Sequence, residues 1–181
     1  MADATLGPSA FIVLGLISQN GALTSYELKH WADSSVGYFW TFPRSQLYAE
    51  PQRLASLGLL TEHQEETGRR RRTFRLTPAG RQALDEWLAS PAGFPELRDL
   101  GLLKLHFLLR TPEDAALPEV QRLAAEQRAL HEERLATYRG ITLPHDVPED
   151  RPELRGTLHL GILYEEACIA FWGAYLNQPR G

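Results

Sequence analysis

Two strand-like runs, residues 59–66 and 72–77, flank a Thr-Gly pair and follow three segments with helical patterning. In the second run Phe74 and Leu76 face one way and the residues between them face the other, as in a β-strand. These runs predict a β-hairpin. Four consecutive arginines lie at and beyond its tip: Arg69, Arg70, Arg71 and Arg72. Because like charges repel, we expect the tip to be a solvated cationic projection that attracts polyanions.

Two helices are predicted at the start of the chain. The first covers residues 8–21, with Pro8 in its first turn, a nearly all-round apolar surface and a stop at Asn20-Gly21. The second lies within residues 23–35 and opens with Thr24, which forms a capping box with Glu27 three residues later. Its expected inward side chains are Leu28, Trp31 and Ala32.

A third helix is predicted from about Pro43 to Gly58, with Leu47, Leu54 and Leu57 inward. Pro51 lies inside it, and an interior proline removes a helical hydrogen bond, so the helix is expected to kink there. A fourth helix follows the hairpin, with Thr77 as its cap and Pro78 in its first position. Its expected inner residues are Ala83, Leu84, Trp87 and Leu88.

The second half of the chain is predicted to be helical. Residues 90–97 resemble a linker, residues 98–110 form a mostly buried helix, and a further helical stretch begins at Thr111. Pro118 restarts a longer helix that ends near Tyr138. Its stripe has near-heptad spacing and should pack along another helix: Val120, Leu123, Ala124, Leu130, Leu135 and Tyr138.

A proline-rich loop, residues 140–154, separates that helix from the last one, which runs from about Glu153 to Leu176. The last helix is apolar on most sides, and a second protomer could cover it. We therefore expect two domains, residues 1–90 and residues 91–181.

Composition excludes several classes of protein. The formal net charge is −4, but Lys/Arg and Asp/Glu balance at nine each over residues 1–90, and local patches rather than the sum attract polyanions. The single cysteine, Cys168, excludes an intramolecular disulfide framework and suits a reducing compartment. Neither a signal peptide nor a membrane span is evident, so a cytoplasmic location is expected.

Catalytic and metal-binding signatures are missing from the sequence. The six histidines form neither HExxH nor another ligand cluster, and Cys168 is interpreted as a small buried hydrophobe rather than a redox sensor. No GxSxG, Gly-rich phosphate loop or nucleophile–base pair occurs. No cofactor and no enzymatic activity are expected.

The order of three helices and a hairpin is that of a winged helix-turn-helix, whose third helix enters the major groove of DNA while the hairpin reaches phosphates. The fold class is therefore mainly α with a small β-hairpin wing, followed by an α-helical dimerisation domain. Cationic side chains on the wing suit this task, since each neutralised phosphate releases condensed counterion.

The sequence also resembles the PadR-type transcriptional regulators. The resemblance is carried by FIVLGLIS, TSYELKHWADSSVGYFW, SQLYAEPQRLASLGLL and GRRRRTFRLTPAGRQALDEWL, and in the second half by FPELRDLGLLKLHFLL and LHLGILYEEACIAFWGAYL. The usual third-helix pattern has proline directly after the tyrosine and leucine before the spaced RL. Here Ala49 and Pro51 occupy those places, which leaves the shape of the recognition helix open.

The resemblance implies a homodimer that binds a palindromic operator on double-stranded DNA, usually as a repressor, and in some members a small aromatic effector releases it. The residues implied in DNA binding are Ser25, Tyr26, Lys29, Arg44, Ser45, Gln46, Tyr48, Arg69, Arg70, Arg71, Arg72 and Thr73. Arg53 and Arg75 are interpreted instead as surface ion-pair partners. Tyr26 and Tyr48 are as readily packed as in contact with DNA.

An effector pocket would need aromatic side chains where the halves of a dimer meet. The candidates are Trp87, His106, His159, Tyr164, Phe171 and Trp172, although each alone is more often plain core. Two other functions stay open: a winged-helix module that binds a protein partner, and a small-molecule-binding protein without a DNA function.

Overall fold

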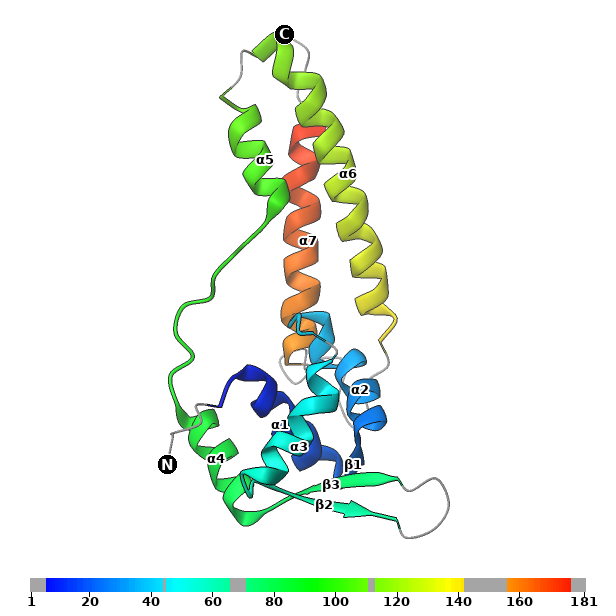
Figure 1. Cartoon of the computed structure of the whole chain (residues 1–181). Coiled ribbons are helices and arrows are strands. Elements are labelled where there is room, and N and C mark those ends of the chain that lie inside the picture. Colours follow the sequence, from blue (N-terminus) through cyan, green and yellow to red (C-terminus); the bar gives the residue numbers. More distant parts are fainter. Residues whose placement is uncertain (1–5, 44, 66–70, 111–112, 142–155, 177–181) are drawn as a thin grey trace. The chain divides into compact units, whose positions relative to one another are not determined.

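The computed structural model describes residues 6–43, 45–65, 71–110, 113–141 and 156–176 (Figure 1). The chain divides into two compact units, Met1–Phe94 and Pro95–Gly181. The division falls inside the linker that the sequence predicted at residues 90–97. Each unit is described by itself below.

The first unit is helical with a small sheet. Its elements are α1 (Pro8–Asn20), β1 (Leu23–Thr24), α2 (Ser25–Asp33), the 3-10 helix η1 (Val36–Tyr38), α3 (Gln46–Ser56), β2 (Leu60–Gln64), β3 (Arg72–Leu76) and α4 (Pro78–Ala89). This order confirms the predicted fold class, in which three helices precede a hairpin wing.

The sheet has three antiparallel strands in the order β1-β3-β2. The predicted hairpin is confirmed, with Leu60 opposite Leu76 and Gln64 opposite Arg72. The sequence missed β1, in which Leu23 pairs with Phe74. A strand of two residues has too little periodicity to be recognised, and only its partner β3 makes it a strand.

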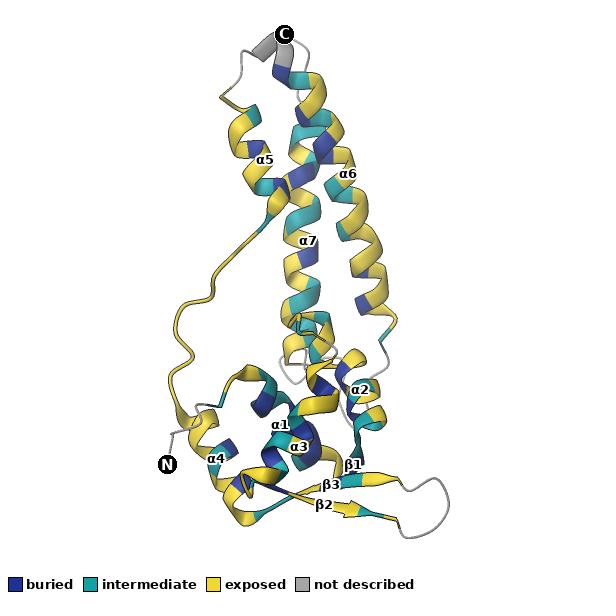
Figure 2. Ribbon diagram, viewed as in Figure 1, coloured by how far each residue is buried: buried dark blue, intermediate teal, exposed yellow. Residues whose placement is uncertain are grey.

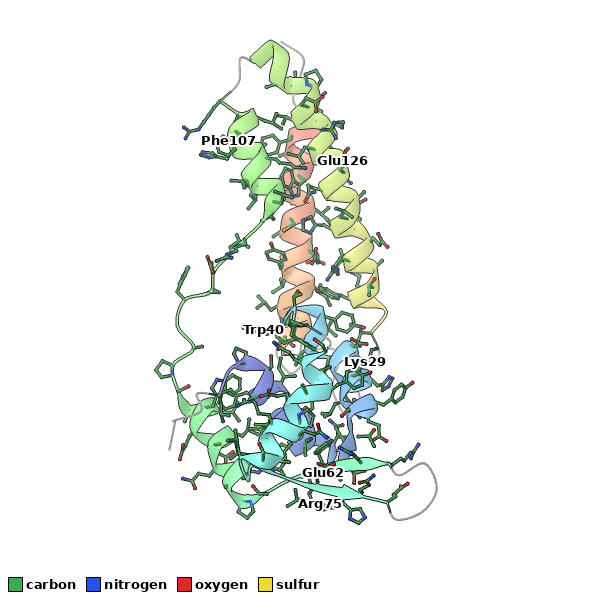
Figure 3. All side chains as sticks on the ribbon, viewed as in Figure 1. Lys29, Trp40, Glu62, Arg75, Phe107 and Glu126 are labelled. Carbon is green, nitrogen blue, oxygen red and sulfur yellow. The ribbon has the colours of Figure 1, made fainter. Side chains whose placement is uncertain are left out.

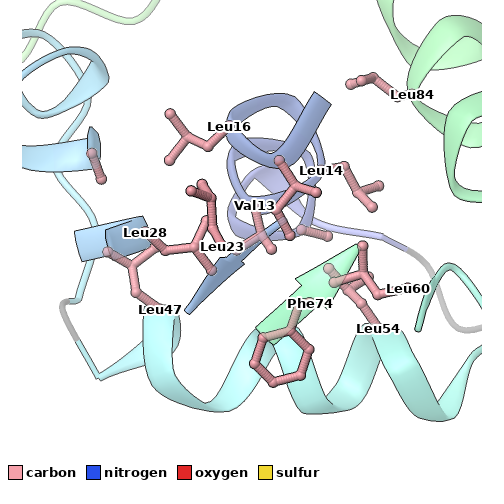
Figure 4. Close-up of a cluster of buried hydrophobic side chains, with 13 residues drawn as sticks. Val13, Leu14, Leu16, Leu23, Leu28, Leu47, Leu54, Leu60, Phe74 and Leu84 are labelled. Carbon is pink, nitrogen blue, oxygen red and sulfur yellow. The ribbon is translucent and has the colours of Figure 1, made fainter. Parts of the chain in front are cut away.

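A single apolar core holds the first unit together (Figure 4). Val13 and Leu14 of α1 lie at its centre, and α1 contacts α2, α3, α4 and β3. This explains the all-round apolar character of α1. Phe74 adds a buried aromatic ring from the inner face of β3, as the strand alternation predicted.

Helix α3 runs continuously through Pro51 and begins at Gln46, three residues later than expected. The Pro51 side chain is fully buried on the inner face, beside Leu47 and Leu54. The ring lacks the N–H that would bond to the carbonyl of Leu47, and its burial in the core offsets that loss. The tertiary packing thus settles the course of this helix, which the sequence left open.

Four apolar side chains expected to point inward are exposed instead: Trp31, Leu57, Trp87 and Leu88. Each lies at the edge of the apolar stripe of its helix or near the end of that helix. The core covers only the middle of the stripe, so these side chains stay exposed. Trp87 is 44% exposed and its ring stacks on Phe11 of α1, with centroids 4.6 Å apart. The prediction of these four as core residues was wrong.

The second unit consists of α5 (Leu100–Leu108), α6 (Glu113–Arg139) and α7 (Thr157–Leu176). Helix α6 passes through Pro118 without the predicted restart. Five of the six predicted stripe residues of α6 are buried, whereas Leu130 is 58% exposed. The core of this unit surrounds Trp172 of α7, which packs with Leu105, Val120, Leu123 and Ala124.

Polar contacts join α6 to α7 along the same seam. His131 Nδ1 lies 2.5 Å from the carboxylate of the buried Glu165, and Arg139 donates a 2.7 Å hydrogen bond to Glu166. Helix α5 is less buried than expected. Apart from Gly101 and Leu105 its side chains are half-buried or exposed, and Leu100, Leu103 and Phe107 lie open on one side (Figure 2).

The capping box of α2 is confirmed. The backbone N–H and the hydroxyl of Thr24 each donate a 2.8 Å hydrogen bond to the Glu27 carboxylate, and the Thr24 hydroxyl accepts from the Glu27 N–H at 3.2 Å. These bonds lower the pKa of Glu27 below its ordinary value of 4.5, and the positive charge of Arg71 lowers it further.

Glu27→Gln keeps an acceptor for the Thr24 N–H but removes the negative charge at the helix N-terminus, so it should lower the free energy of unfolding by about 0.3–1 kcal/mol at neutral pH. A lowered folded-state pKa stabilises the protein above the unfolded-state pKa, and this stability is lost as the pH falls through the folded value. The difference in the free energy of unfolding between wild type and variant should therefore become smaller below about pH 4.5. Urea unfolding at several pH values measures it, with Glu86→Gln on α4 as control. A difference that is constant with pH would contradict this account.

Candidate nucleic-acid interface

Strand β1 places the start of α2 beside the wing. Thr24 pairs with Thr73 of β3, and Ser25 and Tyr26 follow directly in the first turn of α2. Tyr26 is 75% exposed. The sequence left open whether its ring is packed or available for contact with DNA, and this exposure favours an available ring. Ser25 is half-buried. The sequence interpretation named these residues but had no means of linking them to the hairpin, because it missed β1.

Lys29 lies one turn further along α2 (Figure 3). Its ammonium group forms a 2.7 Å ion pair with Asp33, four residues on. An exposed pair of this kind is worth little and exchanges readily for another anion. Lys29 can therefore turn to a phosphate at small cost.

The outward face of α3 carries polar and small side chains. Ser45 and Gln46 at its start are exposed, and Tyr48 is 51% exposed. Ser45 makes no side-chain capping bond, so its hydroxyl is not engaged by the helix start. The Gln46 amide is held by Ser9 of α1, whose hydroxyl donates to Oε1. Arg44 lies outside the described residues.

Arg53 forms an ion pair with Glu50 inside α3, as the sequence interpretation expected. Its guanidinium donates two hydrogen bonds to Glu50, at 3.0 Å and 2.5 Å, and they raise the pKa of Arg53. Gln52 is exposed, although it directly follows the buried Pro51. The sequence interpretation did not name Gln52.

Arg71 and Arg72 are the wing arginines that the structure describes, and both are exposed. Arg72 begins β3, and its guanidinium lies 3.3 Å from the Glu62 carboxylate of β2. The Arg71 carbonyl accepts a 3.0 Å hydrogen bond from the N–H of Glu65, which extends the ladder past the last strand pair. The wing therefore presents these cations on a hydrogen-bonded hairpin.

The sequence interpretation also covered four other residues of the wing. Thr73 is half-buried, and its hydroxyl donates to the carbonyl of His63 at 3.4 Å. Arg75 is exposed and makes no ion pair with any described residue, contrary to the prediction (Figure 3). Arg69 and Arg70 lie outside the described residues.

The six effector candidates do not share one unit. Trp87 belongs to the first unit and the other five to the second. His106 on α5 is exposed, and His159 near the start of α7 is half-buried. Trp172 is fully buried, and Phe171 contacts it edge to face at 5.1 Å between centroids. Trp172 is thus a core residue of its unit.

Tyr164 and Cys168 lie one turn apart on α7. Burial, together with the neighbouring Cys168, raises the pKa of Tyr164 to about 12, and burial also raises the pKa of the Cys168 thiol. Cys168 is therefore a poor nucleophile. It packs against the core of its unit but is half-buried, not buried as the sequence interpretation expected. Among the described residues, no group of three His, Cys, Asp or Glu side chains could hold a metal ion. In the described part of the chain, no helix combines the length and apolarity needed to cross a membrane.

Three helices, a short strand and a cationic hairpin in one unit define a winged helix-turn-helix protein. Residues 13–86 match the transcriptional regulator PadR-like family, and residues 97–178 match the virulence activator alpha C-terminal family. The first unit therefore matches the PadR-like family of transcriptional regulators, the family that the sequence resembles.

Relatives with known structures or functions support this assignment. The negative transcriptional regulator PadR of Bacillus subtilis (strain 168) is 30% identical over 101 residues, which cover 54% of this chain and 55% of that protein. The match thus spans about half of that relative. The crystal structure of B. subtilis PadR in complex with operator DNA has a TM-score of 0.76 at 23% identity, and covers 92% of this chain and 96% of that one.

A second structure of B. subtilis PadR is in complex with p-coumaric acid. It has a TM-score of 0.72 at 22% identity, with 92% of this chain and 95% of that chain covered. At these identities the two structures establish a shared fold over nearly the whole chain.

Proposed function

We propose that this protein is a sequence-specific DNA-binding regulator that acts as a homodimeric repressor on an inverted-repeat operator. The observation that carries the proposal is the β1–β3 pairing, which joins the start of α2 to a hairpin that bears Arg71 and Arg72. Helix α3 belongs to the same compact unit, so its polar face and the wing cations are held by one core. The operator-bound relative has the same fold.

The proposed division of labour follows from the chemistry of each element. Ser45, Gln46 and Tyr48, with Arg44 before them, would contact base edges from the start of α3. Ser25, Tyr26, Lys29, Thr73 and the wing arginines, Arg69 to Arg72, would contact phosphates and fix the register of the protein on the duplex. In this arrangement the wing supplies affinity and α3 supplies sequence preference.

The second unit supports a homodimer. Helix α7 carries an uncovered apolar stripe on the side opposite its buried residues, with Leu160, Leu163, Tyr164 and Phe171 between 41% and 68% exposed (Figure 2). Helix α5 adds a second stripe through Leu100, Leu103 and Phe107. Contiguous apolar surface of this kind usually marks an interface, and a twofold dimer would bury the same surface on both protomers.

We further propose a small aromatic effector, no enzymatic activity and a cytoplasmic location. The relative in complex with p-coumaric acid motivates the effector, and the exposed aromatic side chains of α7 are its candidate ligands. The raised pKa of Cys168 and the composition of the described residues give no support to a catalytic centre.

Gel retardation with duplexes from upstream of the protein's own gene tests the DNA function. We expect one retarded species on an inverted repeat whose half-sites are separated by about one helical turn, roughly 34 to 36 Å. A scrambled duplex of equal length is the control, and adding p-coumaric acid tests the effector. If no upstream duplex is retarded at low ionic strength, the DNA function is wrong; a ligand-induced rise in melting temperature without retardation would favour the small-molecule function.

A further inference from the structure

Ser9, near the start of α1, makes an unusual contact for its position. A serine close to a helix N-terminus commonly bonds to the backbone of its own helix, but here the helix begins after Gly7 with no side-chain cap. The Ser9 hydroxyl donates instead to Oε1 of Gln46, the first residue of α3, 37 positions away in the sequence. The two side chains connect the start of α1 to the start of the recognition helix.

Both residues of the Ser9–Gln46 contact lie next to residues buried in the core. Ala10, which follows Ser9, is fully buried, and so are Val13 and Leu14 one turn later. Leu47, which follows Gln46, is 1% exposed in the same core. A long exposed glutamine normally samples many rotamers, and ordering it on binding costs entropy. A hydroxyl fixed on α1 removes part of that cost in advance.

The hydrogen bond also decides which half of the amide is free. The carbonyl oxygen of Gln46 is engaged by Ser9, so the side chain offers its two N–H donors outward. Two donors match base edges rich in acceptors, such as N7 and O6 of guanine. Bidentate reading of adenine needs a donor and an acceptor from the same amide, and the bond from Ser9 takes one of the two lone pairs of the Gln46 oxygen and holds that oxygen toward α1.

We propose that Ser9 is a positioning residue that sets the base preference of Gln46 toward an acceptor edge. The inference rests on the proposed DNA-binding function. It adds a residue of α1 that determines specificity, whereas the proposed DNA contacts come from α2, α3 and the wing. Ser9 itself acts through Gln46 and need not touch the duplex.

The test is a double-mutant cycle on a randomised duplex library, with base preference read at every position. Ser9→Ala should reduce discrimination for guanine about three- to tenfold at one position in each half-site. The preference there should shift toward adenine, because the amide oxygen is no longer held toward α1 and can turn to the base. Gln46→Ala should abolish preference at the same position. In the Gln46→Ala background, Ser9→Ala should have no further effect, since the partner is gone.

Two variants keep the test specific. Ser9→Thr retains a hydroxyl and should restore the wild-type preference. Ser18 lies on α1 like Ser9, but its hydroxyl accepts a 2.5 Å hydrogen bond from Arg81 of α4. Ser18→Ala should therefore leave the base preference unchanged. Melting of each variant without DNA shows that the fold is retained.

Several outcomes would overturn the inference. These are unchanged base preference in Ser9→Ala, equal loss of affinity for all duplexes, or additive effects of the two substitutions. Failure of the wild type to select any sequence would instead refute the proposed function, and the inference with it. Specific binding by the wild type with an unaltered Ser9→Ala preference refutes the inference alone.

Discussion

Replacing Leu163 and Phe171 by glutamate should convert the protein from a dimer to a monomer and lower operator affinity at least about a hundredfold. Both side chains lie on the uncovered stripe of α7, at 49% and 41% exposure. In a twofold interface each substitution occurs twice, so four carboxylates would be buried without partners. The second binding event on the inverted repeat would then lose its intramolecular advantage.

Light scattering measures the mass, and gel retardation measures the affinity. Ala129→Glu is the matched control, because Ala129 is exposed on α6 near Arg122, Glu126 and Glu133, all of which are also exposed. This control should stay dimeric and bind DNA as the wild type does. A double variant that remains dimeric would show that α7 does not form the interface, and a monomeric wild type would remove the homodimer altogether.

Replacing Arg71 and Arg72 by alanine should weaken binding to every duplex roughly ten- to a hundredfold at physiological salt. The two guanidinium groups are exposed on the wing, and the single ion pair described for Arg72 is a long one, 3.3 Å from Glu62. If each contacts one phosphate, the slope of log K against log salt should flatten by about two units. The order of preferred sequences should not change, since phosphates carry no sequence information.

Two controls separate charge from structure. Lysine at both positions keeps the charge and should keep most of the salt slope, whereas Arg98→Ala removes an exposed, ion-paired arginine of the second unit and should change neither quantity. Unchanged affinity and slope in the alanine variant would leave the wing arginines without a role in binding. A change in sequence preference would mean that the wing reads bases.

Local signals were enough to predict most elements of the first unit. The Thr24–Glu27 box starts α2, Thr77 with Pro78 starts α4, and the alternation around Phe74 defines β3. The two caps join atoms within a few residues of one another, and the alternation of β3 is visible within five residues, so each signal is contained in a short stretch of sequence. The stripe of α6 was likewise recognised, because its spacing repeats over five turns.

Contacts between distant residues decided the rest. Strand β1 exists because β3 lies beside it, and α3 passes through Pro51 because the core covers that ring. The width of the core, not the helical period, determines which of Leu54 and Leu57 is buried. The sequence by itself therefore determined the order of the helices and the hairpin, the cationic wing and the resemblance to PadR-like regulators. Only the tertiary structure decided how Ser9 meets Gln46 and which apolar faces stay uncovered, because both depend on distances that no local pattern records.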